Sequence, residues 1–231
     1  MLSKNVSAKV PDYLSRLYWW AYVHPNAVRL FERQWLLNLI LWGNFSRLRN
    51  SALDELGQEI TGATLQIACV YGDFTPRLRQ RLAPDASLDV VDVLPIQLDN
   101  LKRKLGKSDR VRLFCSNSEK LAHAESGSYE QVILFFLLHE LPEQTRVDTM
   151  REAMRVLKPG GKLVIVDYHK PRAWNPLRYF MKPLLAWLEP YALALWQREL
   201  SEFMPASSHK YSIRKRTFFG GLYQQVVLDQ R

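Results

Sequence analysis

Short apolar runs alternate with helix-like segments from residue 64 to the C-terminus. The apolar runs cover residues 65–70, 88–93, 111–115, 132–136 and 163–166. The segments with helical character between them cover residues 76–82, 95–105 and 143–157. This alternation predicts a parallel, doubly wound sheet with right-handed crossovers. A final run, 222–228, follows Gly220-Gly221 and predicts one more strand.

Residues 12–50 combine helical spacing with many aromatic side chains. A first predicted helix carries Tyr13, Leu17, Trp20 and Ala21 on one face. After His24-Pro25, Asn26 can cap a second helix whose apolar face is Val28, Phe31, Trp35, Leu39 and Trp42. Two compatible interpretations follow: a helical cap over the main domain, or an amphipathic segment with its aromatic side chains at a lipid surface.

The pattern predicts an α/β fold with a doubly wound, mostly parallel sheet. We expect an N-terminal helical cap over residues 1–60 and a main domain over residues 61–231. Helices predicted over 175–188 and 191–203, separated by Glu189-Pro190, form an insertion at about 174–205 before the last strand. Within the main domain, residues 64–76 form a strand, a turn at Gly72 and a helix start at Thr75-Pro76, with Thr75 as the cap. This order brings a ligand to a helix N-terminus.

Composition narrows the function classes. Of 231 residues, 47% are hydrophobic, which is enough for a full core, and the net charge of +9 favours an acidic partner such as anionic lipid. Cys69 and Cys115 lie in apolar runs and indicate buried thiols in a reducing compartment. No apolar run is long enough to span a membrane, and no signal-peptide pattern is visible. The basic stretch 209–216 indicates a solvated loop or a lipid contact, and no nucleic-acid-binding motif is present.

One passage carries a resemblance to a known superfamily. Residues 155–167, read RVLKPGGKLVIVD, resemble the turn and fifth strand of class I S-adenosylmethionine-dependent methyltransferases. Residues 129–136, followed by LHEL at 138–141, resemble the fourth strand and the loop after it. The resemblance runs from about residue 60 to the C-terminus and implies seven strands in the doubly wound, mostly parallel sheet. The text FFGGLYQQ at 218–225 is similar to the quinone-biosynthesis branch.

The first turn departs from the superfamily pattern of an acidic residue followed by three glycines. Those places hold Gln66, Ala68, Val70 and Gly72. The runs at 68–73 and 167–171 resemble the rhodoquinone-biosynthesis protein family. This resemblance implies replacement of a methoxy group of ubiquinone by an amino group, with S-adenosylmethionine as amino donor and Mn²⁺ or Mg²⁺ as activator. Two alternatives remain: a conventional quinone methyltransferase, and a non-catalytic membrane-associated scaffold.

The candidate cofactor contacts follow the first three predicted strands. Asp92 ends the second strand, where a carboxylate can accept hydrogen bonds from two ribose hydroxyls. Gly72 is the unhindered position of the first turn, and Tyr71 beside it can stack on the ligand or pack under the helix. Asn117 and Ser118 can hold the adenine edge or form an Asx turn. Cys69 and Val93 belong to the same set, and Phe135 from the fourth predicted strand completes it.

The candidate reactive groups follow strand ends on the same rim of the sheet. We expect Asp73 and Asp167 as metal ligands, with a helix cap as the alternative for Asp73. His139 is the candidate acid or base, and Tyr168 and His169 are further catalytic candidates. The implied partners are ubiquinone and a membrane surface, on the cytoplasmic side of a bacterial membrane or the mitochondrial matrix side. The oligomeric state is open.

Overall fold

The computed structural model describes Pro11, Leu14 and residues 25–230. The helix predicted around residues 13–21 lies outside the described residues. The first half of the described chain contains α2 (Pro25–Phe31), α3 (Gln34–Ile40), α4 (Phe45–Leu56), β1 (Ala63–Ile67), α5 (Phe74–Gln80), β2 (Ser87–Asp92), α6 (Pro95–Leu105) and β3 (Val111–Cys115). The second half contains β4 (Tyr129–Phe135), α7 (Glu143–Val156), β5 (Leu157–Tyr168), α8 (Leu177–Leu188), α9 (Ala194–Gln197), β6 (Tyr211–Phe218) and β7 (Tyr223–Gln230). Short 3₁₀ helices connect some of these elements, namely η2 (Leu138–Glu140), η3 (Leu200–Phe203), η4 (Ala206–Lys210) and η5 (Phe219–Gly221).

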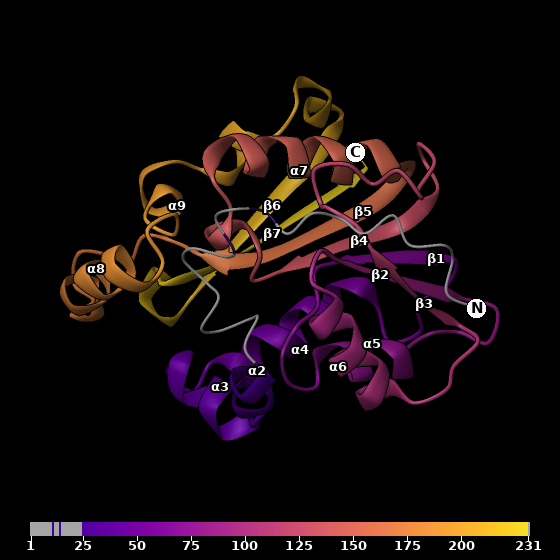
Figure 1. The fold of residues 1–231 in the computed structure, drawn as a ribbon. Helices are drawn as coiled ribbons and strands as arrows, with labels where there is room; N and C mark the ends of the chain where they lie inside the picture. The colour runs from indigo at the N-terminus through magenta and orange to yellow at the C-terminus, as the bar shows by residue number, and fades with distance from the viewer. Residues whose placement is uncertain (1–10, 12–13, 15–24, 231) are drawn as a thin grey trace.

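The strands form one seven-stranded sheet in the order β3-β2-β1-β4-β5-β7-β6 (Figure 1). The first five strands of this order are parallel to one another. β7 pairs antiparallel with both β5 and β6. The prediction of a doubly wound, mostly parallel, seven-stranded sheet is therefore confirmed.

Helices cover both faces of the sheet. α4, α5 and α6 lie on one face and α7 lies on the other (Figure 1). The period of two along β5 explains this, because Leu163 and Ile165 pack with Met150 of α7, whereas Val164 and Val166 belong to the core on the α4 side. The carboxyl ends of the parallel strands therefore meet at one rim, where polar side chains can gather.

The structure corrects four local predictions. Residues 211–218 form the edge strand β6 instead of a solvated loop, and their exposed charges blunt an edge that has only one neighbour. The helix predicted over 191–203 is divided into α9 and η3, and the second N-terminal helix is divided at Glu32-Arg33. α5 begins at Phe74, and the Thr75 hydroxyl donates to Gln66 Oε1 at 3.0 Å instead of capping the helix.

Other boundaries agree closely with the prediction. α6 and β3 have the predicted limits, and Asn175 Oδ1 accepts a hydrogen bond from Leu177 N at 3.1 Å at the start of α8. In the described part of the chain, no helix has the length and apolar character needed to cross a membrane.

Candidate functional site

A cavity of about 460 Å³ lies at the carboxyl ends of the parallel strands, with α2 and α3 contributing one wall. Nine of the candidate residues line it, namely Cys69, Tyr71, Asp92, Val93, Asn117, Ser118, Phe135, His139 and Tyr168. Four do not line it, namely Gly72, Asp73, Asp167 and His169. Its volume is in the range of small-molecule sites.

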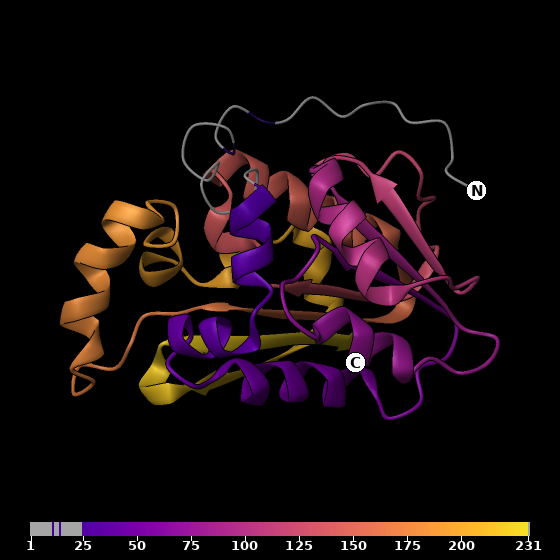
Figure 2. The ribbon, with the colours of Figure 1, turned by 60° about the horizontal axis from the view of Figure 1, so that its bottom comes forward.

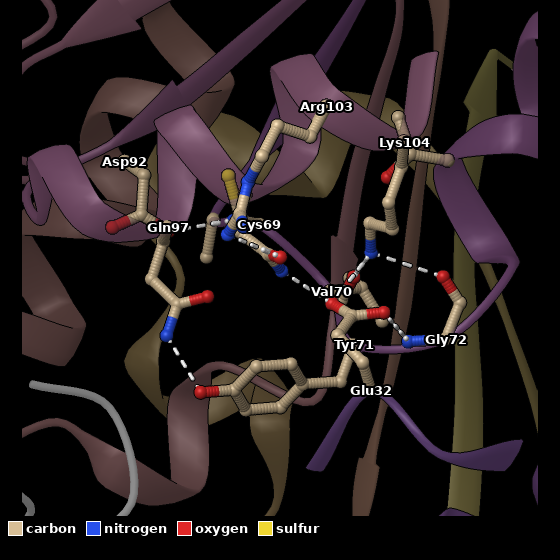
Figure 3. Close-up of polar contacts among 12 residues, drawn as sticks. Glu32, Cys69, Val70, Tyr71, Gly72, Asp92, Gln97, Arg103 and Lys104 are labelled. Atoms are coloured by element: carbon tan, nitrogen blue, oxygen red, sulfur yellow. Dashed lines mark hydrogen bonds and ion pairs between the residues drawn. The ribbon is translucent and has the colours of Figure 1, made fainter. Parts of the chain in front are cut away.

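Asp92 connects two loops at the floor of this cavity (Figure 3). Its Oδ2 accepts a hydrogen bond from Cys69 N at 2.7 Å, and its Oδ1 accepts one from Leu94 N at 2.8 Å. Burial raises the pKa of Asp92 to about 6, although these N–H groups favour the carboxylate. The Cys69 thiol and the Val93 N–H also favour the charged form of this carboxylate, which lines the cavity and is of the type that accepts hydrogen bonds from ligand hydroxyls.

The first turn retains the backbone shape of a glycine-rich turn at one position. Ala68 has φ +73°, a left-handed conformation that favours glycine. Gln66 is fully buried, and its Nε2 donates to Ala68 O at 2.9 Å. Gln66 therefore stabilises the turn from inside and is not among the residues that line the cavity.

Tyr71 forms a wall of the cavity. Its hydroxyl accepts a hydrogen bond from Gln97 Nε2 at 2.7 Å, and its ring stacks on Phe31 of α2 at 5.7 Å. Burial raises the pKa of Tyr71, so the phenol stays neutral. The ring thus packs against a helix, as one of the two alternatives for Tyr71 expected, and because it also lines the cavity, contact with a ligand stays a prediction.

Gly72 serves the N-terminal helices and not the cavity, contrary to the prediction. A Cβ at Gly72 would lie 2.7 Å from Leu37 Cδ1 and 3.1 Å from Phe45 Cζ, and φ is +77°. Only glycine therefore allows α3 and α4 to approach this closely. The Gly72 N–H donates to Glu32 Oε2 at 3.1 Å.

Glu32, which follows α2, fastens this segment to the main domain (Figure 3). Its Oε1 accepts hydrogen bonds from Lys104 Nζ at 2.8 Å and Asn100 Nδ2 at 2.6 Å. Lys104 Nζ also donates to Val70 O at 3.1 Å and Gly72 O at 3.0 Å. One carboxylate and one ammonium group thus link α2, α6 and the first turn.

His139, which lines another part of the cavity, forms a buried pair with Asp167 behind it. His139 Nδ1 lies 2.9 Å from Asp167 Oδ1. Asp167 Oδ2 also accepts from Leu138 N at 2.8 Å, and Oδ1 accepts from Tyr168 N at 2.7 Å. Asp167 therefore lies behind His139 and orients its ring.

Two further carboxylates stand near the outer nitrogen of His139. Nε2 is 3.6 Å from Glu140 Oε1 and 3.5 Å from Glu189 Oε2. Burial alone would lower the pKa of His139, but the charges of Asp167, Glu189 and Glu140 raise it to about 10. Burial also raises the pKa of Glu189. His139 is therefore a cation at neutral pH.

Aromatic rings surround His139. Tyr168 meets it edge-to-face at 5.0 Å, and Phe136 does so at 5.9 Å. Phe136 has φ +54°, which is a strained conformation for a bulky side chain. Strain of this kind concentrates at functional sites, and Phe136 lines the cavity.

Asn117 and Ser118 line the cavity, but their side chains are partly engaged elsewhere. Asn117 Nδ2 donates to Glu119 Oε1 at 2.8 Å, and Asn117 Oδ1 accepts from Glu119 N at 3.4 Å. This is the Asx-type arrangement that the sequence left open. The Ser118 hydroxyl lies 2.8 Å from Thr149 Oγ1. Backbone groups are thus the freer contacts for a ligand here.

The predicted metal ligands do not come together as a site. Asp73 is held at 2.5 Å by both Arg49 and Arg77. Partial burial works to raise the pKa of Asp73, but these two arginines lower it. Asp167 is saturated by His139 and backbone N–H groups. No cluster of three or more His, Cys, Asp and Glu side chains suited to a metal occurs among the described residues. The donor set does not fit Mn²⁺ or Mg²⁺.

His169 lies outside the cavity, in contrast to the prediction. Its Nδ1 is 2.8 Å from Gly221 O, and its Nε2 is 3.0 Å from Lys215 Nζ. His169 extends the pairing of β5 with β7 by one step, because His169 N donates to Leu222 O, just before β7, at 2.8 Å. His169 directly follows β5, and its side chain therefore points to the edge of the sheet.

Sequence reasoning missed Glu140, Glu189 and Gln97 as cavity residues. Glu140 adjoins His139 in sequence. Glu189 is the only acidic residue between Asp167 and Glu199, in an otherwise apolar and basic stretch. A single acidic residue in such a stretch was the sequence signal that could have identified Glu189 as a candidate. Gln97 lies on the first turn of α6, and nothing in its sequence context marks it.

Comparison with known proteins agrees with this geometry. Residues 64–161 match the methyltransferase domain family. The chain is 27% identical over 161 residues to the ubiquinone/menaquinone biosynthesis C-methyltransferase UbiE of Pseudomonas savastanoi pv. phaseolicola (strain 1448A / Race 6), covering 65% of this chain and 61% of that protein. It is 26% identical over 149 residues to a demethylmenaquinone methyltransferase of Staphylococcus aureus (strain JH9), covering 64% and 60%. The chain thus spans about three fifths of the length of these relatives.

A solved structure supports the fold. The SAM-dependent methyltransferase of Aquifex aeolicus superposes with a TM-score of 0.55 at 17% identity, covering 90% of this chain and 99% of that one. Its likeness concerns the fold alone. The match to the methyltransferase domain family agrees with the strand order and with the cavity at the strand ends. Residues 64–161 are therefore similar to the methyltransferase domain family, and the chain has the fold of a class I S-adenosylmethionine-dependent methyltransferase.

Proposed function

We propose that this chain is an S-adenosylmethionine-dependent transferase that methylates the ring of a lipid-soluble quinol. One observation carries the proposal: a single cavity is lined by Asp92 at the end of β2 and by His139 and Glu189 on the other side. This arrangement offers a donor region and a reactive region within one enclosure. The names of the quinone-modifying relatives support the acceptor class.

The donor region would be formed by the ends of the first three strands. Asp92 would accept the ribose hydroxyls, and the backbone at residues 116–118 would meet the adenine edge. Cys69 and Tyr71 would line the remainder. S-adenosylmethionine supplies an electrophilic methyl group on a sulfonium when bound. Burial raises the pKa of Cys69 well above its ordinary value, so its thiol stays neutral and does not compete as a nucleophile.

The acceptor region would be the aromatic part of the cavity. Phe135, Phe136 and Tyr168 present apolar surfaces suited to a flat ring. His139 Nε2 would donate a hydrogen bond to a ring oxygen and stabilise negative charge on it. Glu189, whose burial raises its pKa, would accept the proton that the ring releases. α2 and α3 would exclude water from this region.

Amino transfer to ubiquinone, the reaction of rhodoquinone biosynthesis, is the second candidate. The altered first turn favours it, since Gln66 is a neutral internal residue and Gly72 turns toward the α3–α4 segment. The cationic His139 could also polarise a quinone carbonyl, the role first expected of a metal. Either acceptor remains in lipid, so we expect the protein to work on the cytoplasmic face of a bacterial membrane or on the matrix side in mitochondria.

Isotope transfer separates these candidates. The protein is incubated with S-adenosylmethionine carrying a ¹³C-methyl group and a ¹⁵N-amino group, together with a short-tailed demethylated quinol or a short-tailed ubiquinone. Mass spectrometry of the quinone products is the readout. ¹³C in the product of the demethylated quinol establishes methyl transfer. Loss of methoxy with gain of ¹⁵N from ubiquinone establishes amino transfer instead. Intact cofactor binding with neither product indicates a non-catalytic scaffold.

Variants of His139 and Glu189 test whether the observed reaction takes place in this cavity. His139→Gln and Glu189→Gln should each reduce turnover at least 100-fold, because general acid–base groups typically contribute about that much. His209→Gln is the matched control, because His209 is exposed on η4 and is not among the residues that line the cavity. Equal activity of the His139 and His209 variants would remove His139 from the reaction.

A further inference from the structure

A second cavity, of about 340 Å³, lies between the segment after β5, α8 and α9. Three cationic side chains line it: Lys170, Arg178 and Lys182. Its other lining residues are Tyr179, Leu193, Trp196 and Gln197, so none of them is acidic. Within the described part of the chain, none of the three cations forms an ion pair with a carboxylate. The cavity therefore concentrates positive charge without compensation.

Two features of this cavity are unfavourable for the folded chain without a ligand. Arg178 and Lys182 are four residues apart on one helix, where like charges are neighbours and repel. Trp196 is 8% exposed, and its buried indole N–H has no hydrogen-bond partner among the described residues. A buried donor without a partner is costly. An anionic ligand with several oxygens, such as a phosphate, would satisfy the indole N–H and the guanidinium together.

Four exposed aromatic side chains lie on α8 and just before it, and one of them, Tyr179, lines this cavity. Trp174, Tyr179, Phe180 and Trp187 are 70%, 73%, 56% and 81% exposed. α8, which carries most of them, stands beyond one end of the sheet in both views (Figures 1 and 2). Single exposed apolar residues are ordinary, but four on one short segment mark an interaction surface.

The aromatic surface continues onto α3. Phe180 meets Trp42 edge-to-face at 5.9 Å, which joins the α8 and α3 regions. Trp35 and Leu39 of α3 are 58% and 66% exposed. Neither α3 nor α8 contains an acidic residue. Aromatic side chains next to cations, with no acid among them, are suited to the boundary between lipid headgroups and acyl chains.

We propose that the α3–α8 face docks on a bilayer and that the Lys170–Arg178–Lys182 cavity binds the phosphate of an anionic phospholipid. The exposed rings of Trp174, Phe180 and Trp187 enter the interfacial region beside that headgroup. This lipid site rests on the membrane contact that the proposed function expects. The test below measures lipid binding and not turnover, so lipid binding and the proposed reaction can fail separately.

Vesicle flotation of the full chain is the test. Vesicles of phosphatidylcholine are compared with vesicles of an equal mixture of phosphatidylcholine and phosphatidylglycerol. We expect strong binding only to the mixture. The triple variant Lys170→Gln, Arg178→Gln, Lys182→Gln should bind it on the order of 100-fold more weakly, because each charge near an anionic surface contributes about a factor of 5–10.

A matched variant separates the cavity from overall charge. Lys102→Gln, Lys107→Gln, Lys120→Gln removes the same number of charges from exposed positions on and after α6 and after β3, at the other end of the molecule. It should bind the mixed vesicles within about threefold of wild type. Equal losses in the two triple variants would overturn the headgroup site. Circular dichroism confirms that each variant is folded.

Two further experiments identify the ligand. Phe180→Ser with Trp187→Ser keeps every charge and should weaken vesicle binding at least tenfold. Titration with inorganic phosphate, followed by tryptophan fluorescence, tests a free anion as the ligand. Phosphate binding without vesicle binding would overturn the lipid assignment in favour of a soluble phosphate ligand. Light scattering that shows a dimer which the serine variant loses would overturn it in favour of a second copy of the chain.

Discussion

Asp167 Oδ1 lies 2.9 Å from His139 Nδ1, with both side chains buried and Asp167 inaccessible to solvent. Asp167 lies in β5 and His139 in η2, just after the neighbouring strand β4, so two adjacent strands bring together residues 28 positions apart. Because Asp167 holds one ring nitrogen, the other is directed to Glu140 and Glu189. The charge state of this group of residues determines what the cavity can do chemically.

Replacing Asp167 by Asn should change the charge state of His139. The amide keeps the shape but removes the charge, so we expect the pKa of His139 to fall from about 10 toward its ordinary value. NMR titration of the His139 ring measures this directly. We also expect a loss of about 3–5 kcal/mol in the free energy of unfolding, because a buried charge loses its partner. Asp109→Asn, at an exposed position, is the control. Titration of His139 still near pH 10 in Asp167→Asn would refute the pairing.

Stability should decrease with alkaline pH through His139. Its pKa of about 10 in the folded chain lies above the ordinary value of 6.5. The contribution of His139 is therefore fully present below pH 6.5 and is lost as the pH rises through 10. Urea unfolding at pH 7 and pH 10 should show a decrease of at least ~2 kcal/mol that is much smaller in His139→Gln. His209→Gln should retain the wild-type decrease. The same pH dependence in His139→Gln would show that other groups cause it.

Ala68 should accept glycine with a gain in stability. A left-handed conformation costs an alanine roughly 1 kcal/mol, which glycine avoids. Ala68→Gly should thus raise the free energy of unfolding by up to about 1 kcal/mol in urea denaturation. Ala63→Gly is the matched control, because Ala63 begins β1 and is not among the residues with positive φ. There glycine should destabilise by roughly 0.5–1 kcal/mol. Equal changes at both positions would contradict the strain at Ala68.

Glu32 should keep α2 and α3 closed over the cavity. Glu32→Gln retains the side-chain shape but weakens the bonds to Lys104 and the Gly72 N–H. Hydrogen–deuterium exchange of residues 25–41 should become several-fold faster, with a loss of about 1–2 kcal/mol in local stability. Glu59→Gln, at an exposed position, should leave exchange in this segment unchanged. Unchanged exchange in Glu32→Gln would show that apolar packing alone holds the helices.

The sequence predicted the sheet because its signal is local. Apolar runs such as 111–115 and the helix start at Pro95 depend on neighbouring residues, and both agree with the structure. β6 was missed because Arg214, Lys215 and Arg216 are exposed on an edge strand and lack an apolar alternation.

The site was predicted unevenly for the same physical reason. The position of a residue after a strand end placed Asp92 and His139 at the cavity correctly. Whether such a residue faces the cavity depends on partners that are distant in sequence. Leu37 packs closely on Gly72, and Arg49 forms an ion pair with Asp73. Glu189 reaches His139 from a segment 50 residues later in the chain, and no local pattern encodes that approach.

Calorimetric titration with S-adenosylhomocysteine tests the cavity assignment most directly. The wild-type chain should bind one equivalent, and affinity should increase as the pH rises past 6, where Asp92 ionises. Asp92→Asn should bind roughly 10- to 100-fold more weakly, because a hydrogen bond to a charged group contributes about 1.5–3 kcal/mol. Asp85→Asn, at an exposed position, should bind as wild type does. Absence of binding by the wild-type chain, or equal affinity of the Asp92 and Asp85 variants, would contradict the account.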